Sequence, residues 1–72
     1  MAGFAIVRNN KKKPGEKEYR KISMVNGQQK IDWSFDPNDA MNCDENDAKA
    51  IRDQLRKNGD TGYTYHREFL DD

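Results

Sequence analysis

The stretch KISMVNGQQKIDW, residues 21–33, decides the fold, because an Asn-Gly pair separates two short runs that alternate apolar and polar side chains. Asn26-Gly27 suits a two-residue type I′ turn, in which both central residues need a positive φ angle. Such a turn sets the register of a β-hairpin and places Ile22 opposite Ile31. The sequence therefore predicts an antiparallel hairpin of defined register.

In this register the two faces of the hairpin differ in character. The polar face would carry Lys21, Ser23, Lys30 and Asp32, and the apolar face would carry Ile22, Met24, Ile31, Trp33 and Phe35. This division is typical of an antiparallel pair that buries one face. We therefore expect Ile22, Ile31 and Trp33 to lie in the core.

Two further strands are predicted from β-forming residues. GFAIVRN, residues 3–9, suits a first strand, and GYTYHREFL, residues 62–70, alternates as a last strand. Residues 10–17 combine a lysine run with Pro14-Gly15, which predicts a solvated loop.

A helix is predicted over residues 44–57. Asp44 or Asn46 would cap it, basic residues fill its last turn before Gly59, and an apolar stripe runs along it through Ala48, Ile51 and Leu55. One loose turn, begun by Asp36 with Pro37 next to it, would precede this helix.

The element order is thus βββαβ, and residues 1–72 are interpreted as a single α+β domain of two layers. We expect a mostly antiparallel sheet with one helix packed on one face. If the helix runs back along the sheet, the last strand lies parallel to the first or to the third strand, which would make the sheet mixed. The pattern does not choose between these positions.

Composition sets further bounds. In a chain of 72 residues the core is small, and such a core rarely contributes more than about 3–5 kcal/mol. Thirteen basic residues balance thirteen acidic ones, but residues 1–35 carry eight basic and three acidic side chains, whereas residues 36–72 carry five and ten. The chain is electrically bipolar, and a partner or a second copy would add buried area.

Cysteine and apolar content indicate the compartment. The single Cys43 excludes an intrachain disulfide, and no apolar run approaches the roughly 20 residues of a membrane span. At the N-terminus the charges follow a very short apolar patch, which is the reverse of a signal peptide. We expect a cytoplasmic protein that needs no cofactor and makes no membrane contact.

A basic group is the first candidate site. It comprises Lys11, Lys12, Lys13, Lys17 and Arg20, which would hold phosphates while Tyr19 or Trp33 stacks a base. The alternative interpretation is a solvated loop that protects a sheet edge, and it is favoured because the net charge is zero.

An acidic group is the second candidate site, formed by Asp36, Asp39, Asp44, Glu45 and Asp47. Their spacing does not match a calcium-binding EF-hand loop, and we expect no metal. Helix capping explains these side chains, and the alternative is an acidic surface that meets a basic protein partner.

Alternate aromatic residues mark the last strand. Tyr63, Tyr65 and Phe69 are interpreted as its core face. If this strand lies at the sheet edge, it would pair with a second copy or with a strand of a partner, and we take it as the predicted self-association strand of a homodimer.

Catalytic signatures are weak. Cys43 and His66 lie in different elements without a local nucleophile motif, and the chain has too few histidines and cysteines for a zinc site. We expect that the protein is not an enzyme.

Residues 33–69, WSFDPNDAMNCDENDAKAIRDQLRKNGDTGYTYHREF, have an aromatic strand, D-P-x-x-A, D-A-x-x-I-x-x-x-L and a closing strand. This layout resembles that of small phage-encoded α+β accessory and inhibitor proteins. The resemblance implies a protein that acts by contact on a host enzyme or a defence system, as anti-CRISPR proteins do, and it carries over no site residue.

Three hypotheses follow. The first is a small non-enzymatic protein-binding protein of phage or mobile-element type that inhibits or modulates its partner. The second is a nucleic-acid-binding module that uses the basic group. The third is an oligomeric sponge that encloses a nucleotide-like ligand.

Overall fold

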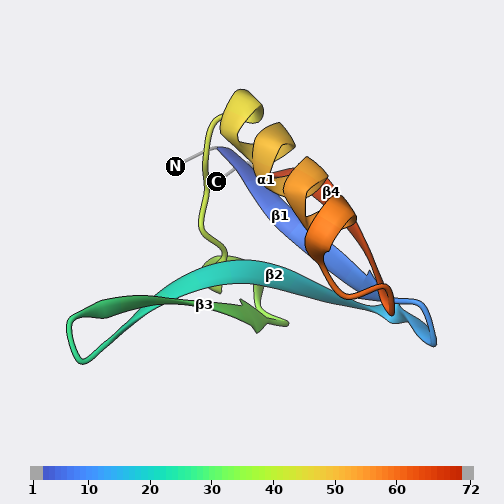
Figure 1. Cartoon of the computed structure of the whole chain (residues 1–72), viewed down its shortest axis with the longest axis horizontal. Coiled ribbons are helices and arrows are strands. Elements are labelled where there is room, and N and C mark those ends of the chain that lie inside the picture. Colours follow the sequence, from blue (N-terminus) through green and yellow to red (C-terminus); the bar gives the residue numbers. More distant parts are fainter. Residues whose placement is uncertain (1–2, 71–72) are drawn as a thin grey trace.

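The computed structural model describes residues 3–70, and over this range the chain forms one antiparallel sheet with a helix on one face. The elements are β1 (Gly3–Asn10), β2 (Lys13–Val25), β3 (Gln28–Ser34), the 3-10 turn η1 (Pro37–Asp39), α1 (Glu45–Asn58) and β4 (Tyr63–Leu70). The strand order across the sheet is β3-β2-β1-β4 (Figure 1). The predicted α+β class and the order βββαβ are confirmed.

The hairpin has the predicted register. Ile22 faces Ile31, and Val25 faces Gln28 beside the turn. Asn26 has a φ angle of 53° and Gly27 one of 78°, as the central residues of a type I′ turn require. Local turn chemistry therefore sets the alignment of β2 and β3.

The direction of β4 excludes the mixed sheet, which the sequence pattern left open as an alternative. β4 pairs with β1 and is antiparallel to it, with Gly3 opposite Leu70 and Asn10 opposite Tyr63. The reason lies in the linker before the helix, because Cys43 bonds to Phe4 near the start of β1. Helix α1 then runs in the direction of β1, so that β4 must return along it.

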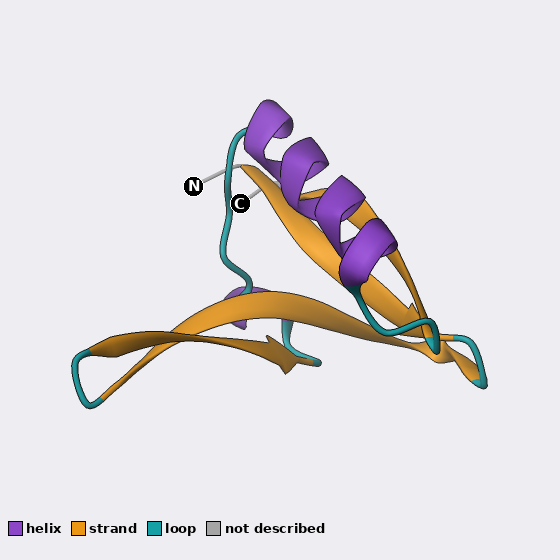
Figure 2. Cartoon of the chain, in the orientation of Figure 1, coloured by secondary structure: helices purple, strands orange, loops and turns teal. Residues whose placement is uncertain are grey.

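The linker also fills a gap inside the sheet. β2 pairs with β1 only between Val7 and Asn10 of β1, and on the N-terminal side of Val7 the two strands diverge (Figure 2). In the gap, the amide of Cys43 donates to the carbonyl of Phe4 at 2.9 Å, and the amide of Met41 donates to the carbonyl of Arg20 at 3.0 Å. The hairpin thus projects away from β1 and β4.

The loop predicted over residues 10–17 is shorter than expected. β2 begins at Lys13, which leaves Lys11 and Lys12 as the turn. The pairing shifts from Asn9 opposite Lys17 to Asn10 opposite Lys13, so that Pro14 and its two following residues bulge out of the ladder. A bulge accommodates Pro14, because proline has no N–H group to give to the ladder.

Helix capping follows the sequence prediction. Asp36 accepts a hydrogen bond from the amide of Asn38 at 2.9 Å, and Asp44 accepts one from the amide of Asp47 at 2.8 Å. These bonds satisfy amides that lack a partner within the helix. Both turns therefore begin at the predicted residues.

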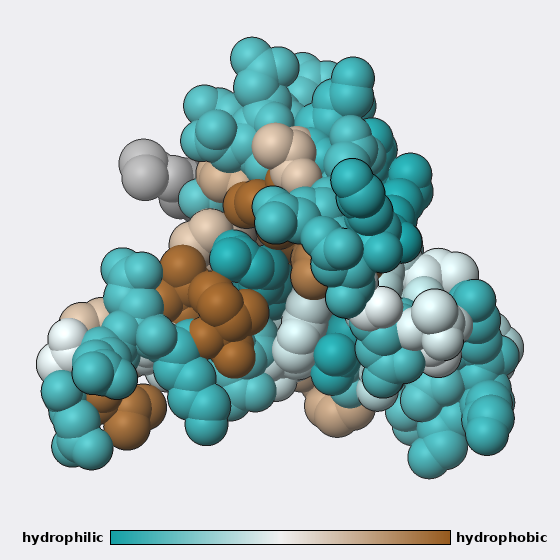
Figure 3. Space-filling model, in the orientation of Figure 1, coloured by the Kyte–Doolittle hydropathy of each residue, from teal (hydrophilic) through white to brown (hydrophobic). Residues whose placement is uncertain are grey.

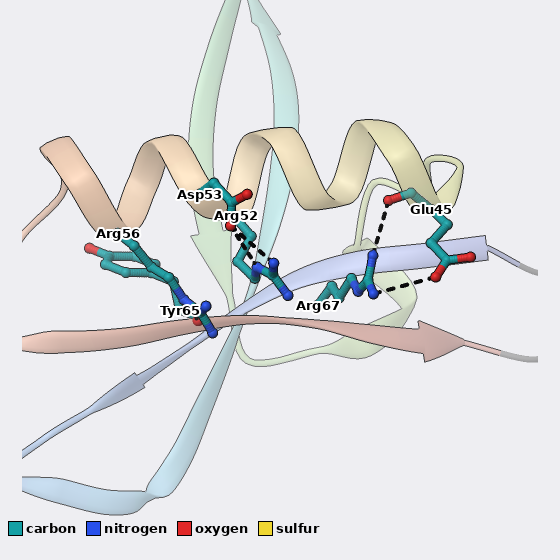
Figure 4. A network of polar contacts seen from close by, with 6 residues as sticks. All are labelled: Glu45, Arg52, Asp53, Arg56, Tyr65 and Arg67. Carbon is teal, nitrogen blue, oxygen red and sulfur yellow. Dashed lines mark hydrogen bonds and ion pairs between the residues drawn. The ribbon is translucent and has the colours of Figure 1, made fainter.

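Two arginines fix α1 to β4, as Figure 4 shows. At the start of the helix, Arg67 of β4 donates to the carbonyl of Glu45 at 3.4 Å and forms an ion pair with its carboxylate at 3.3 Å. Near the end of the helix, Arg56 donates from Nε to the carbonyl of Tyr65 at 2.9 Å. The helix is thereby held along β4 at both ends.

The core is smaller than the sequence indicated. Among residues 3–70 the buried apolar side chains are Ala5, Ile6, Val7, Tyr19, Ala48 and Tyr65. The expected burial of the apolar hairpin face is wrong for Met24, Ile31 and Phe35, which are 65%, 46% and 64% exposed, while Ile22 and Trp33 are half-buried. A helix is about 10 Å wide and strands lie about 4.8 Å apart, so that one helix covers two strands, here β1 and β4.

Gly59 caps the end of α1 and lies close to Tyr65 of β4, so that a substitution at this position tests how tightly the helix packs on the strand. A Cβ atom there would collide with the carbonyl oxygen of Leu55 and lie 2.9 Å from the hydroxyl oxygen of Tyr65. We expect Gly59→Ala to lower the free energy of unfolding by about 1–3 kcal/mol. Gly15→Ala is the matched control, since nothing lies within 4 Å of its added Cβ, and it should leave stability unchanged or raise it by about 0.4–1 kcal/mol. Urea denaturation would check both, and equal stability of the two variants would contradict the tight closure.

Candidate functional site

The face of the hairpin that points to the helix side of the sheet is largely uncovered. Facing residues share one side of a sheet, which places Arg20 with Trp33 and Ile22 with Ile31 on this side. Hydrophobic surface gathers over the hairpin below α1 in Figure 3. The chain thus displays apolar side chains that a two-layer domain would normally cover.

A groove lies between this face and the second half of α1. Its volume is about 320 Å³, and its lining residues are Arg20, Ile31, Ile51, Gln54, Leu55, Asn58 and Gly59. Ile51 and Leu55 stand one helical turn apart and face Ile31 across the groove, because all three line it. We call this groove, together with the uncovered hairpin face, the hairpin cleft.

Arg20 is the only charged residue of the described chain that lines the groove. Its guanidinium contacts the sulfur of Met41 at 4.0 Å, and no carboxylate within residues 3–70 forms an ion pair with it. A thioether is a weak acceptor for a group with five N–H donors. The groove therefore combines apolar walls with an incompletely bonded cation.

Arg8 holds the base of the hairpin in place. Its guanidinium lies 4.4 Å from the ring centre of Trp33 and 4.1 Å from that of Tyr63, and it forms an ion pair with Glu18. Trp33 also contacts Tyr65, with ring centres 6.2 Å apart. Cation–π and aromatic contacts of this kind each contribute about 0.5–1.5 kcal/mol. They orient Trp33 across the sheet and so position the neighbouring cleft.

The outer edge of β3 is open beside the groove. The carbonyl of Arg20 bonds to Met41, so that the backbone groups of Arg20 point away from β3. Facing residues of an antiparallel pair are either both bonded to each other or both directed outward. Trp33 lies opposite Arg20, so that its backbone groups point outward from the sheet, and its amide bonds to the side chain of Asp32 at 2.8 Å. Ile31 lies two residues before Trp33 in β3, and its backbone groups therefore also point outward.

The predicted basic group is divided by the structure. Lys11 and Lys12 form the turn, and Lys13 starts β2. Lys17 forms an ion pair with Glu68 at 3.0 Å, which raises the pKa of Lys17, on the face opposite to Arg20. Tyr19 is buried and Trp33 is stacked on Arg8, so that neither ring is presented to a base.

The predicted acidic group is divided by the structure, although its members are all exposed: Asp36 and Asp39 lie at η1 beside β2, and Asp44, Glu45 and Asp47 lie at the start of α1, at the other end of the linker (Figure 1). Asp36 and Asp44 are caps, Asp39 accepts a hydrogen bond from the hydroxyl of Ser34 at 2.7 Å, and Glu45 pairs with Arg67. No cluster of three or more histidine, cysteine or carboxylate side chains within residues 3–70 is arranged to hold a metal ion.

The predicted self-association strand lies at the sheet edge, as β4. Its three aromatic residues differ, since Tyr65 is buried, Tyr63 stacks on Arg8, and Phe69 is 55% exposed and contacts Phe4 edge-on at 5.3 Å. The carbonyl of Tyr65 is occupied by Arg56 (Figure 4). A second copy pairing here would have to displace Arg56.

Cys43 and His66 lie in different elements, Cys43 in the linker before α1 and His66 in β4. The thiol of Cys43 donates to the carbonyl of Phe4 at 3.4 Å, and burial raises its pKa, with Asp47 adding to the shift. Burial lowers the pKa of His66, which lies opposite Val7 in the sheet. A raised thiol pKa disfavours the nucleophilic thiolate.

The cleft was not foreseen from the sequence, although a signal for it exists. A helix of 14 residues can cover only two strands, while the sequence predicts four strands with apolar residues on the hairpin. One helix is too narrow to cover four strands, so that one face of the hairpin is expected to stay uncovered.

Comparisons with known proteins give no assignment. Within residues 3–70, no helix is long and apolar enough to cross a membrane. No protein-family model, no curated protein and no solved structure matches this chain.

Proposed function

We propose that this chain is a small non-enzymatic protein-binding protein and that its partner docks in the hairpin cleft. The observation that carries the proposal is the uncovered apolar face, on which Met24 is 65% and Ile31 46% exposed beside a groove of about 320 Å³. Apolar patches that a small domain leaves open are typical of interaction sites. Docking would bury area that this small core lacks.

A protein partner accounts for the cleft better than a nucleic acid does. Nucleic-acid sites combine several phosphate-contacting cations with free aromatic rings. Here Lys17 and Arg20 lie on opposite faces, and the groove walls are aliphatic. The acidic residues at the start of α1, Asp44, Glu45 and Asp47, would supply a second, polar contact.

The class of partner follows from the resemblance of residues 33–69 to small phage-encoded inhibitors. In this proposal the protein blocks or modulates a host enzyme or a defence system by occupying part of its surface. Small size suits such a role, since inhibition by contact needs only a complementary surface.

Capture from the lysate of the native host tests the proposal. The wild-type chain should retain one protein, identified by mass spectrometry, and Ile31→Asp should lose at least about tenfold in affinity, since it places a charge in a desolvated contact. Lys30→Asp is the matched control, because it lies next along β3 with its side chain on the opposite face.

Two results would contradict the proposal. One is a partner that Ile31→Asp retains with unchanged affinity while circular dichroism shows the variant folded. The other is binding of generic RNA or DNA at about 50 mM salt that weakens steeply with added salt, as phosphate contacts require.

A further inference from the structure

The charged side chain that lines the groove, Arg20, favours a negatively charged group on a ligand. Arg20 supplies the positive charge of the described lining; its guanidinium contacts the sulfur of Met41, a weak acceptor, and no carboxylate within residues 3–70 forms an ion pair with it. Arg8 provides the contrast, since it is paired with Glu18 and lies between two rings. A planar guanidinium in a partly apolar setting binds a carboxylate through two parallel hydrogen bonds. Arg20 is therefore suited to bind a carboxylate.

The walls of the groove select an apolar side chain. Ile31 of β3 lies across from Ile51 and Leu55 of α1, and Gln54 and Asn58 also line the groove. A volume of about 320 Å³ is at the lower end of the range of about 300–1,000 Å³ for small-molecule pockets. The groove thus suits an anchoring side chain of a polypeptide.

The open edge of β3 selects the backbone conformation. The N–H and C=O groups of Ile31 point outward from the sheet, where an extended segment can bond to them. In an added strand every second side chain points to the helix side of the sheet. Arg20 lies opposite Trp33, which is two residues after Ile31 in β3. Two residues of the added strand, with one residue between them, would therefore direct their side chains toward Ile31 and Arg20.

We propose that the hairpin cleft binds an extended segment of a partner protein with an acidic and an apolar side chain at alternate positions. The segment adds to β3, its apolar side chain packs between Ile31 and Leu55, and its carboxylate pairs with Arg20. This inference rests on the proposed function and names the chemistry of the partner.

A display library of random peptides of roughly ten residues, the length of a long strand, tests the inference. Selection on the wild-type chain should enrich an acidic and an apolar residue at alternate positions. Selection on Arg20→Glu should lose the acidic residue and enrich lysine or arginine in its place. Lys30→Glu carries the same kind of charge change on the opposite face and should keep the wild-type preference.

Affinity and position are measured on one selected peptide. Its glutamate-to-glutamine version, and the Arg20→Glu variant, should each weaken binding about tenfold or more, since a hydrogen bond between charged groups is lost. In amide-resolved NMR, the peptide should shift the signals of Gln29 and Ile31.

The outcomes separate this inference from the proposed function. Apolar peptides that bind the cleft equally well in wild type and Arg20→Glu would overturn the carboxylate contact and leave protein binding intact. A host partner lost by Ile31→Asp, together with no enriched peptide, would overturn the extended segment alone. Random single-stranded RNA that shifts the cleft signals in place of any peptide would overturn both proposals.

Discussion

Replacing Tyr65 with alanine should leave the protein largely unfolded at room temperature. Tyr65 is only 5% exposed, stacks near Trp33 and Tyr63, and donates its hydroxyl to the carbonyl of Asp60 at 3.2 Å. Truncation of a buried aromatic side chain costs about 3–5 kcal/mol. This equals the whole stability that a core of this size supplies, about 3–5 kcal/mol. Far-UV circular dichroism and urea denaturation would measure the loss.

Two matched variants control this prediction. Phe69→Ala removes an aromatic ring from the same strand, but the ring is 55% exposed and contacts Phe4, so that we expect a loss of about 0.5–1.5 kcal/mol. Tyr65→Phe removes only the hydroxyl bond, at about 0.5–1.5 kcal/mol. If Tyr65→Ala were as stable as Phe69→Ala, Tyr65 would not be a core residue.

The double variant Asn26→Ala, Gly27→Ala should lower the free energy of unfolding by about 2–3 kcal/mol. Both residues have positive φ angles, 53° and 78°, and an alanine in the left-handed region costs about 1–2 kcal/mol. Asn26 already pays part of the conformational free energy of a positive φ angle in the wild-type protein. The expected loss is therefore smaller than twice the upper value for one alanine. The midpoint of urea denaturation should fall with little change in its slope.

Asn26→Gly serves as the control for the turn. Glycine accepts the same φ angle, and a Gly-Gly pair is compatible with a type I′ turn, so that stability should change by less than about 1 kcal/mol. Unchanged stability of the double alanine variant would contradict the turn type, and with it the pairing of Ile22 with Ile31.

Most of the local structure could be predicted from the sequence. The hairpin register, the caps at Asp36 and Asp44 and the extent of α1 depend on residues that are neighbours in the chain. Positive φ angles at a turn and unpaired amides at a helix start are short-range requirements. The residue types that satisfy them are therefore readable without any tertiary contact.

The candidate site could be predicted only in part. The sequence predicts a role for Arg20 and for Ile31, but it predicts Arg20 as a phosphate contact and Ile31 as a core residue. The role that we propose for the two residues together depends on α1 lying next to the hairpin and not over it. The site is a relation between distant segments, and no spacing within the sequence records it.

By itself, then, the sequence determined the elements, their order, the hairpin register and an apolar hairpin face. Only the tertiary structure decided that β4 returns antiparallel to β1 and that this face stays open. The physical reason is that the linker bonds to Phe4 and Arg20, which carries α1 to the start of β1 and away from β3. One helix is wide enough for two strands, and the position of α1 over β1 and β4 leaves β2 and β3 uncovered.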